Sequence, residues 1–412
     1  MEPISGTSVW QNAAIENLPA ELRHAILHAL DYKSLRAMAQ ASPVFHQQYL
    51  QGRRLLLSGC LQRTLGTATV DACAVYRSNP ECFTDERTRE SVTQFLEPYR
   101  NRLSLTTYSI SDEGLADKEV EALFAFHLTV IEPLVQSFVN WALGNFARET
   151  EAPPPPQPLS RTEEARIVRA MYRFQLCCNL FHDRRHQWIS VQLDALDMLE
   201  LVFSLFEPWE VEQVVCVYAF VQDRFDRIFS AIHGDVSREH PRFADVPRGS
   251  TPIDSFDFDN DYERTTWLGG TVLSGLGRLH SVLFKMRDHE HLVSTMQKTI
   301  TGGELFDDAL WDVSQSTLRR EQPSERDLKE EAREPLPFVG DVVPDIQGSS
   351  CPPLAWTLVW KGTYSNRYGD YLGDKMRRWG YVMWDAARLE VGKGEALIWT
   401  QWGAETDPRE MP

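Results

Sequence analysis

The sequence predicts a mainly α-helical protein with a minor β element near its C-terminus. From the start of the chain to about residue 320, apolar residues recur three and four positions apart, the spacing that places them on one face of a helix. Strand-like runs are few: the clearest is segment 354–360, and segment 396–402 is its possible partner. No internal repeat of about 30–45 residues is visible, so a solenoid or propeller is not expected.

Composition places the chain among ordinary globular proteins. It has 412 residues, enough for two or three domains, with 42% hydrophobic and 25% charged residues. The formal net charge of -17 argues against sequence-independent binding of nucleic acid, which needs clustered Lys and Arg. We therefore expect no nucleic-acid partner.

The N-terminus and the apolar stretches predict neither secretion nor a membrane span. Segment 1–6 has no basic start and no apolar core, unlike a secretory signal. The apolar stretches 128–143 and 199–221 contain glutamates, so we expect buried core helices and no membrane partner. The seven cysteines include no Cys-x-x-Cys pair, which indicates reduced, mostly buried thiols. The expected location is the cytoplasm or the nucleus.

Three breaks divide the chain. Segment 152–159 contains a run of prolines and should be an extended connector. Segment 235–261 is predicted to be a long exposed loop, and segment 321–350 a flexible linker. The predicted units are a three-helix element over 1–50, a helical region over 51–151, the connector over 152–159, a helical domain over 160–320, the linker over 321–350, and a Trp-rich segment over 351–412 that packs on the helical domain.

Three short helices are predicted within the first fifty residues. Pro19 suits a first helical turn, where its missing amide donor costs nothing. Ser34 and Ser42 are plausible N-caps of the second and third helices. The apolar stripe of the first helix consists of Leu22, Ile26, Leu27 and Leu30. A bundle this small buries little apolar surface, so it needs a partner or a neighbouring domain.

The ordered residues of this element resemble an F-box. Segment 18–49 follows the order Leu-Pro-x-Glu-Leu-x-x-x-Ile-Leu-x-x-Leu-Asp-x-x-Ser-Leu and then Ser-Pro-x-Phe-x-x-x-Tyr, similar to the F-box common among filamentous-fungal proteins. The resemblance implies docking on a Skp-type adaptor of a cullin–RING ubiquitin ligase. The adaptor-binding residues that it implies are Leu18, Pro19, Leu22, Ile26, Leu27 and Leu35. Many F-boxes end with a Cys-Arg-x-Trp-like segment, whereas the third helix here offers Phe45, His46 and Tyr49, which leaves adaptor binding open.

Tryptophan is concentrated near the C-terminus. Half of the twelve tryptophans fall in segment 351–412: Trp356, Trp360, Trp379, Trp384, Trp399 and Trp402. Segment 376–385 has helical spacing and is similar to a Trp-Gly-Tyr-x-x-Trp-Asp segment of uncharacterised fungal F-box-like proteins. Such aromatic density marks a binding surface or a core. We favour a core that closes the helical domain.

No motif predicts a metal or a cofactor. His182 and His186 stand four apart, but no third zinc ligand is evident and two arginines lie between them. The acidic run 257–261 lacks the glycine and glutamate of a calcium-binding loop. We therefore expect a surface histidine pair and an exposed acidic loop.

No motif predicts an active site either. Gly269 and Gly270 lie in a helical context and match no phosphate-binding loop, so they favour close helix packing. Cys177 and Cys178 lie among apolar residues that would raise a thiol's pKa. A helical enzyme remains a third hypothesis, which would need a deep pocket with convergent titratable groups. Its candidate residues are His280, Asp288 and His289.

The leading hypothesis is therefore a non-catalytic adaptor of the ubiquitin conjugation pathway. It would recognise a target protein for a Skp–cullin–F-box ligase and act by proximity alone. The alternative is a helical interaction or scaffold protein whose F-box-like fold no longer binds the adaptor. An open apolar face at Leu18, Ile26 and Leu35 would favour the adaptor, and burial of these residues would favour the scaffold.

Overall fold

The structure confirms the mainly helical prediction. The computed structural model describes residues 14–105, 108–153, 157–182, 193–236, 261–310, 325–342, 351–361 and 372–403. Within these ranges every regular element is a helix, and no strand occurs.

The two strands expected near the C-terminus are helices. Segment 354–360 forms α18 (Leu354–Trp360), and segment 396–402 lies within α21 (Gly394–Gly403). Periodicity alone cannot distinguish a short apolar run in a strand from one in a buried helix. In α18, Trp356 and Trp360 stand four apart and are both buried, which is the helical spacing.

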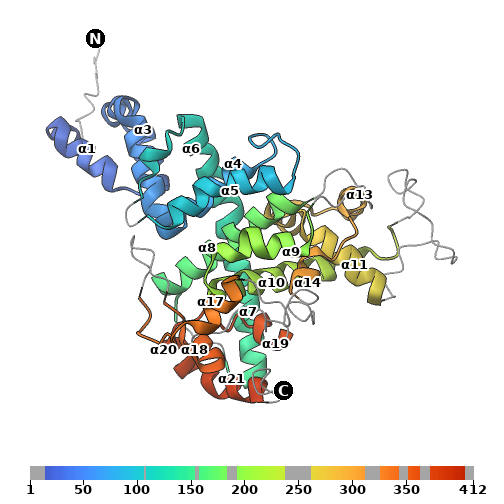
Figure 1. Cartoon of the computed structure of the whole chain (residues 1–412). Helices are drawn as coiled ribbons and strands as arrows, with labels where there is room; N and C mark the ends of the chain where they lie inside the picture. Colours follow the sequence, from blue (N-terminus) through green and yellow to red (C-terminus); the bar gives the residue numbers. More distant parts are fainter. Residues whose placement is uncertain are drawn as a thin grey trace, which may run out of the picture.

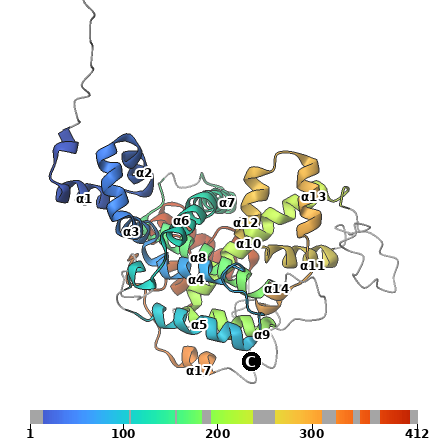
Figure 2. The ribbon, with the colours of Figure 1, turned by 90° about the horizontal axis from the view of Figure 1, so that it is seen from above.

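The first three helices project from one side of the molecule (Figures 1 and 2). They are α1 (Ala20–Ala29), α2 (Tyr32–Ala41) and the first part of α3 (Pro43–Leu65), preceded by the short η1 (Ala14–Asn17). We call residues 18–50 the N-terminal trio. Asp31, and not Ser34, caps α2: its carboxylate accepts the Ser34 amide at 2.9 Å. Ser42 caps α3 as predicted, by accepting the Phe45 amide at 3.3 Å.

Helix α3 belongs both to the trio and to the rest of the molecule. It has 23 residues, and its second half carries the fully buried Leu56, Leu57 and Leu61. Beside it, the Tyr32 ring of α2 stacks on Phe124 with ring centroids 4.3 Å apart. The boundary expected at residue 50 therefore falls inside a continuous helix.

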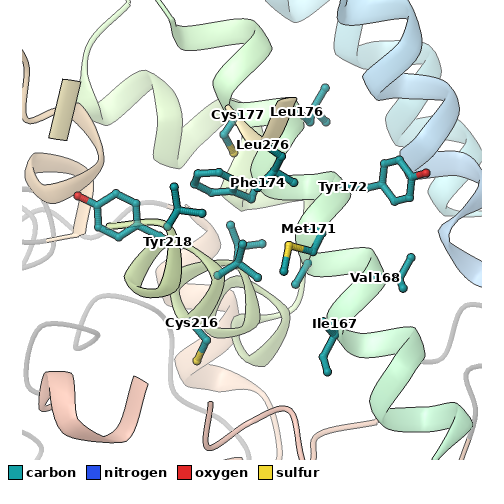
Figure 3. Close-up of a cluster of buried hydrophobic side chains, with 14 of the residues drawn as sticks. Ile167, Val168, Met171, Tyr172, Phe174, Leu176, Cys177, Cys216, Tyr218 and Leu276 are labelled. Carbon is teal, nitrogen blue, oxygen red and sulfur yellow. The ribbon is translucent and has the colours of Figure 1, made fainter. Parts of the chain in front are cut away.

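The centre of the body is the packing of α8 (Arg161–Phe181) on α10 (Pro208–Ile232). Figure 3 shows side chains of both helices meeting in the core together with Leu276. Around this pair lie η2 (Gly66–Ala68), α4 (Thr69–Ser78), α5 (Arg89–Leu103), η3 (Ile110–Glu113), α6 (Asp117–Phe126), η4 (His127–Ile131), α7 (Glu132–Thr150), α9 (Ala195–Asp197), η5 (Met198–Val202), η6 (Phe203–Leu205), α11 (Asp261–Val272), α12 (Leu276–His280), η8 (Ser281–Lys285), α13 (His289–Thr299) and α14 (Leu305–Leu310).

Helices α6, η4 and α7 form one continuous run, Asp117–Thr150. By length and composition alone this run could cross a membrane, but half of its most apolar window is buried inside the fold. Phe138 and Phe146 are fully buried there, as expected for a core helix. Pro133 lacks the amide that a regular helix would use, and the chain widens into the π-helical turn η4 just before it.

Part of the expected linker 321–350 is helical and packed. Residues 325–332 form α17 (Glu325–Ala332), and Arg333 pairs with Glu207 of α10's N-cap at 2.9 Å. Further on, Asp341 pairs with the buried Arg166 at 2.9 Å. Most of the predicted loop 235–261 and residues 154–156 of the proline connector lie outside the described residues.

The C-terminal tryptophans form a core, as predicted. Five of the six are buried, and Trp399 is 48% exposed. The helix expected over 376–385 ends early: α19 (Asp374–Arg378) is followed by turns in which Gly380 has a φ of 66°. Because this left-handed conformation favours glycine, the chain turns there. The Trp384 ring then donates to the Trp379 carbonyl at 2.7 Å.

A buried ion pair ties the C-terminal segment to α8. Arg388 of α20 (Ala386–Val391) donates to both carboxylate oxygens of Glu163 at 2.7 Å, and both residues are at most 3% exposed. Glu163 also accepts the backbone amides of Ser160 and Asp385, at 3.0 and 3.1 Å. One carboxylate therefore joins the start of α8 to a segment more than two hundred residues later.

The cysteines are mostly buried, as predicted. All seven are free, and five of them are buried. Burial raises the pKa of Cys73 to about 11 and raises that of Cys177 further. Cys82 is the exposed one.

Candidate docking site

The outer side of α1 carries an apolar surface open to solvent. Leu22 and Ile26 stand four apart, so they share one face of the helix, and Leu18 and Pro19 directly precede it. Leu22 is 52% exposed, Pro19 is exposed, and Leu18 and Ile26 are partly exposed. Ile15, 43% exposed, lies just before them. We call these five residues the docking face.

The other two predicted adaptor-binding residues do not reach this face. Leu27 and Leu35 are 0% and 1% exposed, and both belong to the continuous core. They hold α1 and α2 against α3. The structure therefore brings together four of the six predicted residues on an open surface and places two beneath it.

Two histidines of α1 lie directly against two glycines of α3. A Cβ added to Gly52 would lie 3.1 Å from Nε2 of His24, and one added to Gly59 would lie 2.9 Å from Nε2 of His28. The Arg23 side chain adds a hydrogen bond from Nε to Gln48 Oε1 at 2.9 Å. Leu27 is fully buried on the inner side of α1, whereas Leu22 is exposed and Ile26 partly exposed.

The third helix of the trio contributes to the core and not to the open face. Phe45 is fully buried, Tyr49 is partly buried, and His46 is exposed. Burial raises the pKa of Tyr49, and the nearby Arg53 opposes the rise. The aromatic positions that depart from the usual F-box ending therefore support the bundle from within.

Sequence reasoning missed three exposed apolar residues. Ile15 precedes the motif, and Leu50 and Leu55 of α3 are 54% and 63% exposed. Gly52, Leu56 and Gly59 line the side of α3 that meets α1. Leu50 stands two residues before Gly52, about 200° around the helix, so it faces away from α1. No signal in the sequence separates it from the buried leucines that follow.

The residues expected for a helical enzyme do not converge. His280 is buried beside Phe284, and burial, with a smaller effect of Lys285, lowers its pKa. Asp288 caps α13 by accepting the His291 amide at 3.1 Å. His289 lies on the surface, with Nε2 2.8 Å from a carboxylate oxygen of Asp235.

The histidine pair and the acidic run that were rejected as metal sites cannot be located in full. His186 and most of the acidic run 257–261 lie outside the described residues. Among the residues that the structure describes, no three His, Cys, Asp or Glu side chains are grouped so that they could hold a metal ion.

Comparison with known proteins adds no relative. No family model matches the chain, and the searches of curated proteins and of solved structures found no match. Function must therefore be argued from the residues themselves.

Proposed function

We propose that this chain is the target-recognition subunit of a Skp–cullin–F-box ubiquitin ligase, with the trio as its adaptor-docking element. The observation that carries the proposal is the open docking face. The apolar side chains of the docking face remain exposed to solvent, and four of its five residues lie within the segment that resembles an F-box. Contiguous exposed apolar surface on a folded protein indicates a place where another protein binds.

The docking face and the buried residues would have different tasks. Leu18, Pro19, Leu22 and Ile26 would enter the interface with a Skp-type adaptor. Fully burying one such side chain contributes about 1.5–3 kcal/mol. Leu27 and Leu35 would instead keep α1 and α2 in position, so their contribution to binding is indirect.

The ligase function needs no chemistry from this chain. The body would hold a target protein, and docking of the trio would raise the effective concentration of a target lysine near the ubiquitin-conjugating enzyme. This work would take place in the cytoplasm or the nucleus, where such ligases operate.

The test is co-purification of the full chain with a Skp-type adaptor, comparing wild type with the double variant Leu22→Ser, Ile26→Ser. We expect wild type to form a stoichiometric complex and the variant to bind at least about 100-fold more weakly, because two apolar side chains leave the interface. Circular dichroism checks that the variant keeps its helices.

The matched control is Leu50→Ser. Leu50 is exposed to the same extent as Leu22, 54% against 52%, but faces away from α1. It should leave adaptor binding unchanged. Equal loss in both variants, or no complex with wild type, would overturn the proposal.

The alternative function is a helical interaction or scaffold protein without adaptor binding. The burial of Leu27 and Leu35 favours it, since two of the six implied contact residues are occupied within the fold. A folded wild-type chain that fails to bind any Skp-type adaptor would select this alternative.

A further inference from the structure

A polar pocket of about 410 Å³ opens between α4, α5, α8, α10 and α17, and no residue of the docking face lines it. This volume is in the range of small-molecule sites. The charged residues that line it are Asp71, Arg102, Arg169, Arg173, Glu207, Glu210, Lys329, Glu330 and Arg333.

The inner wall of the pocket is a buried ion network. Arg173 donates from Nε to Asp71 Oδ1 at 3.2 Å, and its Nη1 lies 3.2 Å from Glu210 Oε1. Arg169 also pairs with Glu210. Burial would raise the pKa of Glu210, but the two guanidinium groups lower it to about 2, so the network stays ionised.

Several polar groups of this pocket have no partner among the described residues. Asp71 is 1% exposed; its Oδ1 accepts from Tyr99 and Arg173, whereas its Oδ2 accepts nothing. Nε of Arg169 and Nε of Arg333 are buried donors without acceptors. A buried polar atom without a hydrogen bond is costly, so a ligand that supplies these bonds is stabilised.

The mouth of the pocket carries one cation without an ion pair to any described residue. Lys329 of α17 is exposed and forms no ion pair with any described residue, and Arg333 follows it by four positions. Arg333 is held over the Trp209 ring and by ion pairs with Glu207 and Glu330, both at 2.9 Å, which fix the end of α17 beside the pocket. Five basic and four acidic side chains line the pocket, and a further carboxylate, Glu113, pairs with the lining Arg102. Lys329 is therefore the lining cation that no described carboxylate neutralises, and an anion would bind there.

We infer that this pocket binds a small zwitterionic molecule, with an anionic phosphate or carboxylate group at Lys329 and Arg333 and an ammonium group at Asp71. The free Oδ2 of Asp71 accepts the ammonium. The lysine ammonium and the arginine guanidinium hold the anion. Such a ligand would join α17 to α4 and α8, and the site does not depend on adaptor docking.

The test is isothermal titration calorimetry on the full chain with four probes at millimolar concentration. O-phosphoethanolamine and 4-aminobutyrate carry both charges and distinguish phosphate from carboxylate. Inorganic phosphate and ethylamine each carry one charge. We expect one of the zwitterions to bind at least about tenfold more tightly than either single-charge probe.

Two variants locate the binding. Lys329→Gln changes an exposed side chain, so it keeps the fold, and it should weaken binding of the zwitterion about tenfold. Asp71→Asn should abolish the preference for the zwitterion over inorganic phosphate. Lys118→Gln, an exposed lysine of α6 outside the pocket, is the matched control and should change nothing.

Three results would overturn the inference. The first is that no probe binds to wild type. The second is that inorganic phosphate binds as tightly as both zwitterions, since Asp71 would then contribute nothing. The third is that Lys329→Gln binds like Lys118→Gln. Because Lys329→Gln needs no change in the buried network, a folding defect of Asp71→Asn cannot hide the outcome.

Discussion

At Gly270 two parts of the chain pass so closely that no side chain fits. A Cβ there would lie 2.1 Å from the carbonyl oxygen of Thr301, which is backbone and cannot rotate away. We expect Gly270→Ala to lower the free energy of unfolding by about 1–3 kcal/mol or more, the cost of overpacking. Urea unfolding followed by circular dichroism measures it.

The control for this substitution is Gly277→Ala. Gly277 lies in α12, and a Cβ there would meet nothing within 4 Å. Alanine should therefore be neutral or stabilise by up to about 1 kcal/mol through helix propensity. Equal destabilisation by both substitutions would contradict the close-approach explanation. The sequence already favoured helix packing at Gly269 and Gly270, and the contact shows the physical reason.

The carboxyl of Asp307 introduces a pH dependence. Burial, with a smaller effect of neighbouring acids, raises its pKa to about 6 from 3.8, while the Tyr218 hydroxyl donates to it at 2.6 Å. Because the folded pKa is the higher one, Asp307 stabilises the fold fully below about pH 4, and this stabilisation is lost as the pH rises through about 6.

Asp307→Asn tests this linkage. The asparagine carbonyl can still accept from Tyr218 but does not ionise. The variant should be more stable than wild type by about 1–3 kcal/mol at pH 7, and the difference should shrink toward pH 4. Chemical unfolding of both proteins across this pH range measures it. A difference that does not vary with pH would exclude the linkage.

At the scale of elements, the C-terminal segment depends on one buried pair. Glu163→Gln would leave the Arg388 guanidinium without its carboxylate, in a site where both residues are almost fully buried. Removing one partner of a buried pair costs about 3–5 kcal/mol. We expect a loss of that order in urea unfolding, with early exposure of the C-terminal tryptophans by fluorescence.

The neighbouring Glu164→Gln is the matched control. Glu164 lies in the same first turn of α8 but is exposed. The same substitution there should change stability by less than about 0.5 kcal/mol. Similar losses at both positions would mean that the pair with Arg388 contributes little.

The elements that the sequence predicted well are those with a local cause. Ser42 followed by Pro43 marks the start of α3, and the apolar spacing of α8 and α10 marks core helices. Segment 354–360 was misassigned because strand and buried helix share a continuous apolar run. The sequence did not predict α17, because residues distant in sequence hold this segment in place: Arg333, directly after the helix, pairs with Glu207.

On the scale of the whole molecule, the trio is not an independent domain. Its third helix continues into the body, and Leu56 and Leu57 of that helix pack in the main core. A fragment of residues 1–50 should therefore show little helical circular dichroism and no cooperative melting, because short helices without tertiary packing are marginal in water. A cooperative transition would contradict this prediction.

The candidate sites differ in how far the sequence revealed them. Motif order pointed to the docking face, but only tertiary packing separates the exposed Leu22 from the buried Leu27 and Leu35. The polar pocket had no sequence signal. Asp71, Arg173 and Lys329 come from three distant segments, and the sequence places Lys329 in an expected linker.

The continuity of α3 has a geometric consequence. Each residue of a helix advances about 1.5 Å and turns about 100°. The number of residues in α3 between its contacts with α1 and its contacts with the core therefore sets the direction in which the docking face points. Stacking of Tyr32 on Phe124 fixes the same angle from a second side. A protein bound to α1 is thereby held in one orientation relative to the body, because no hinge separates α1 from the body.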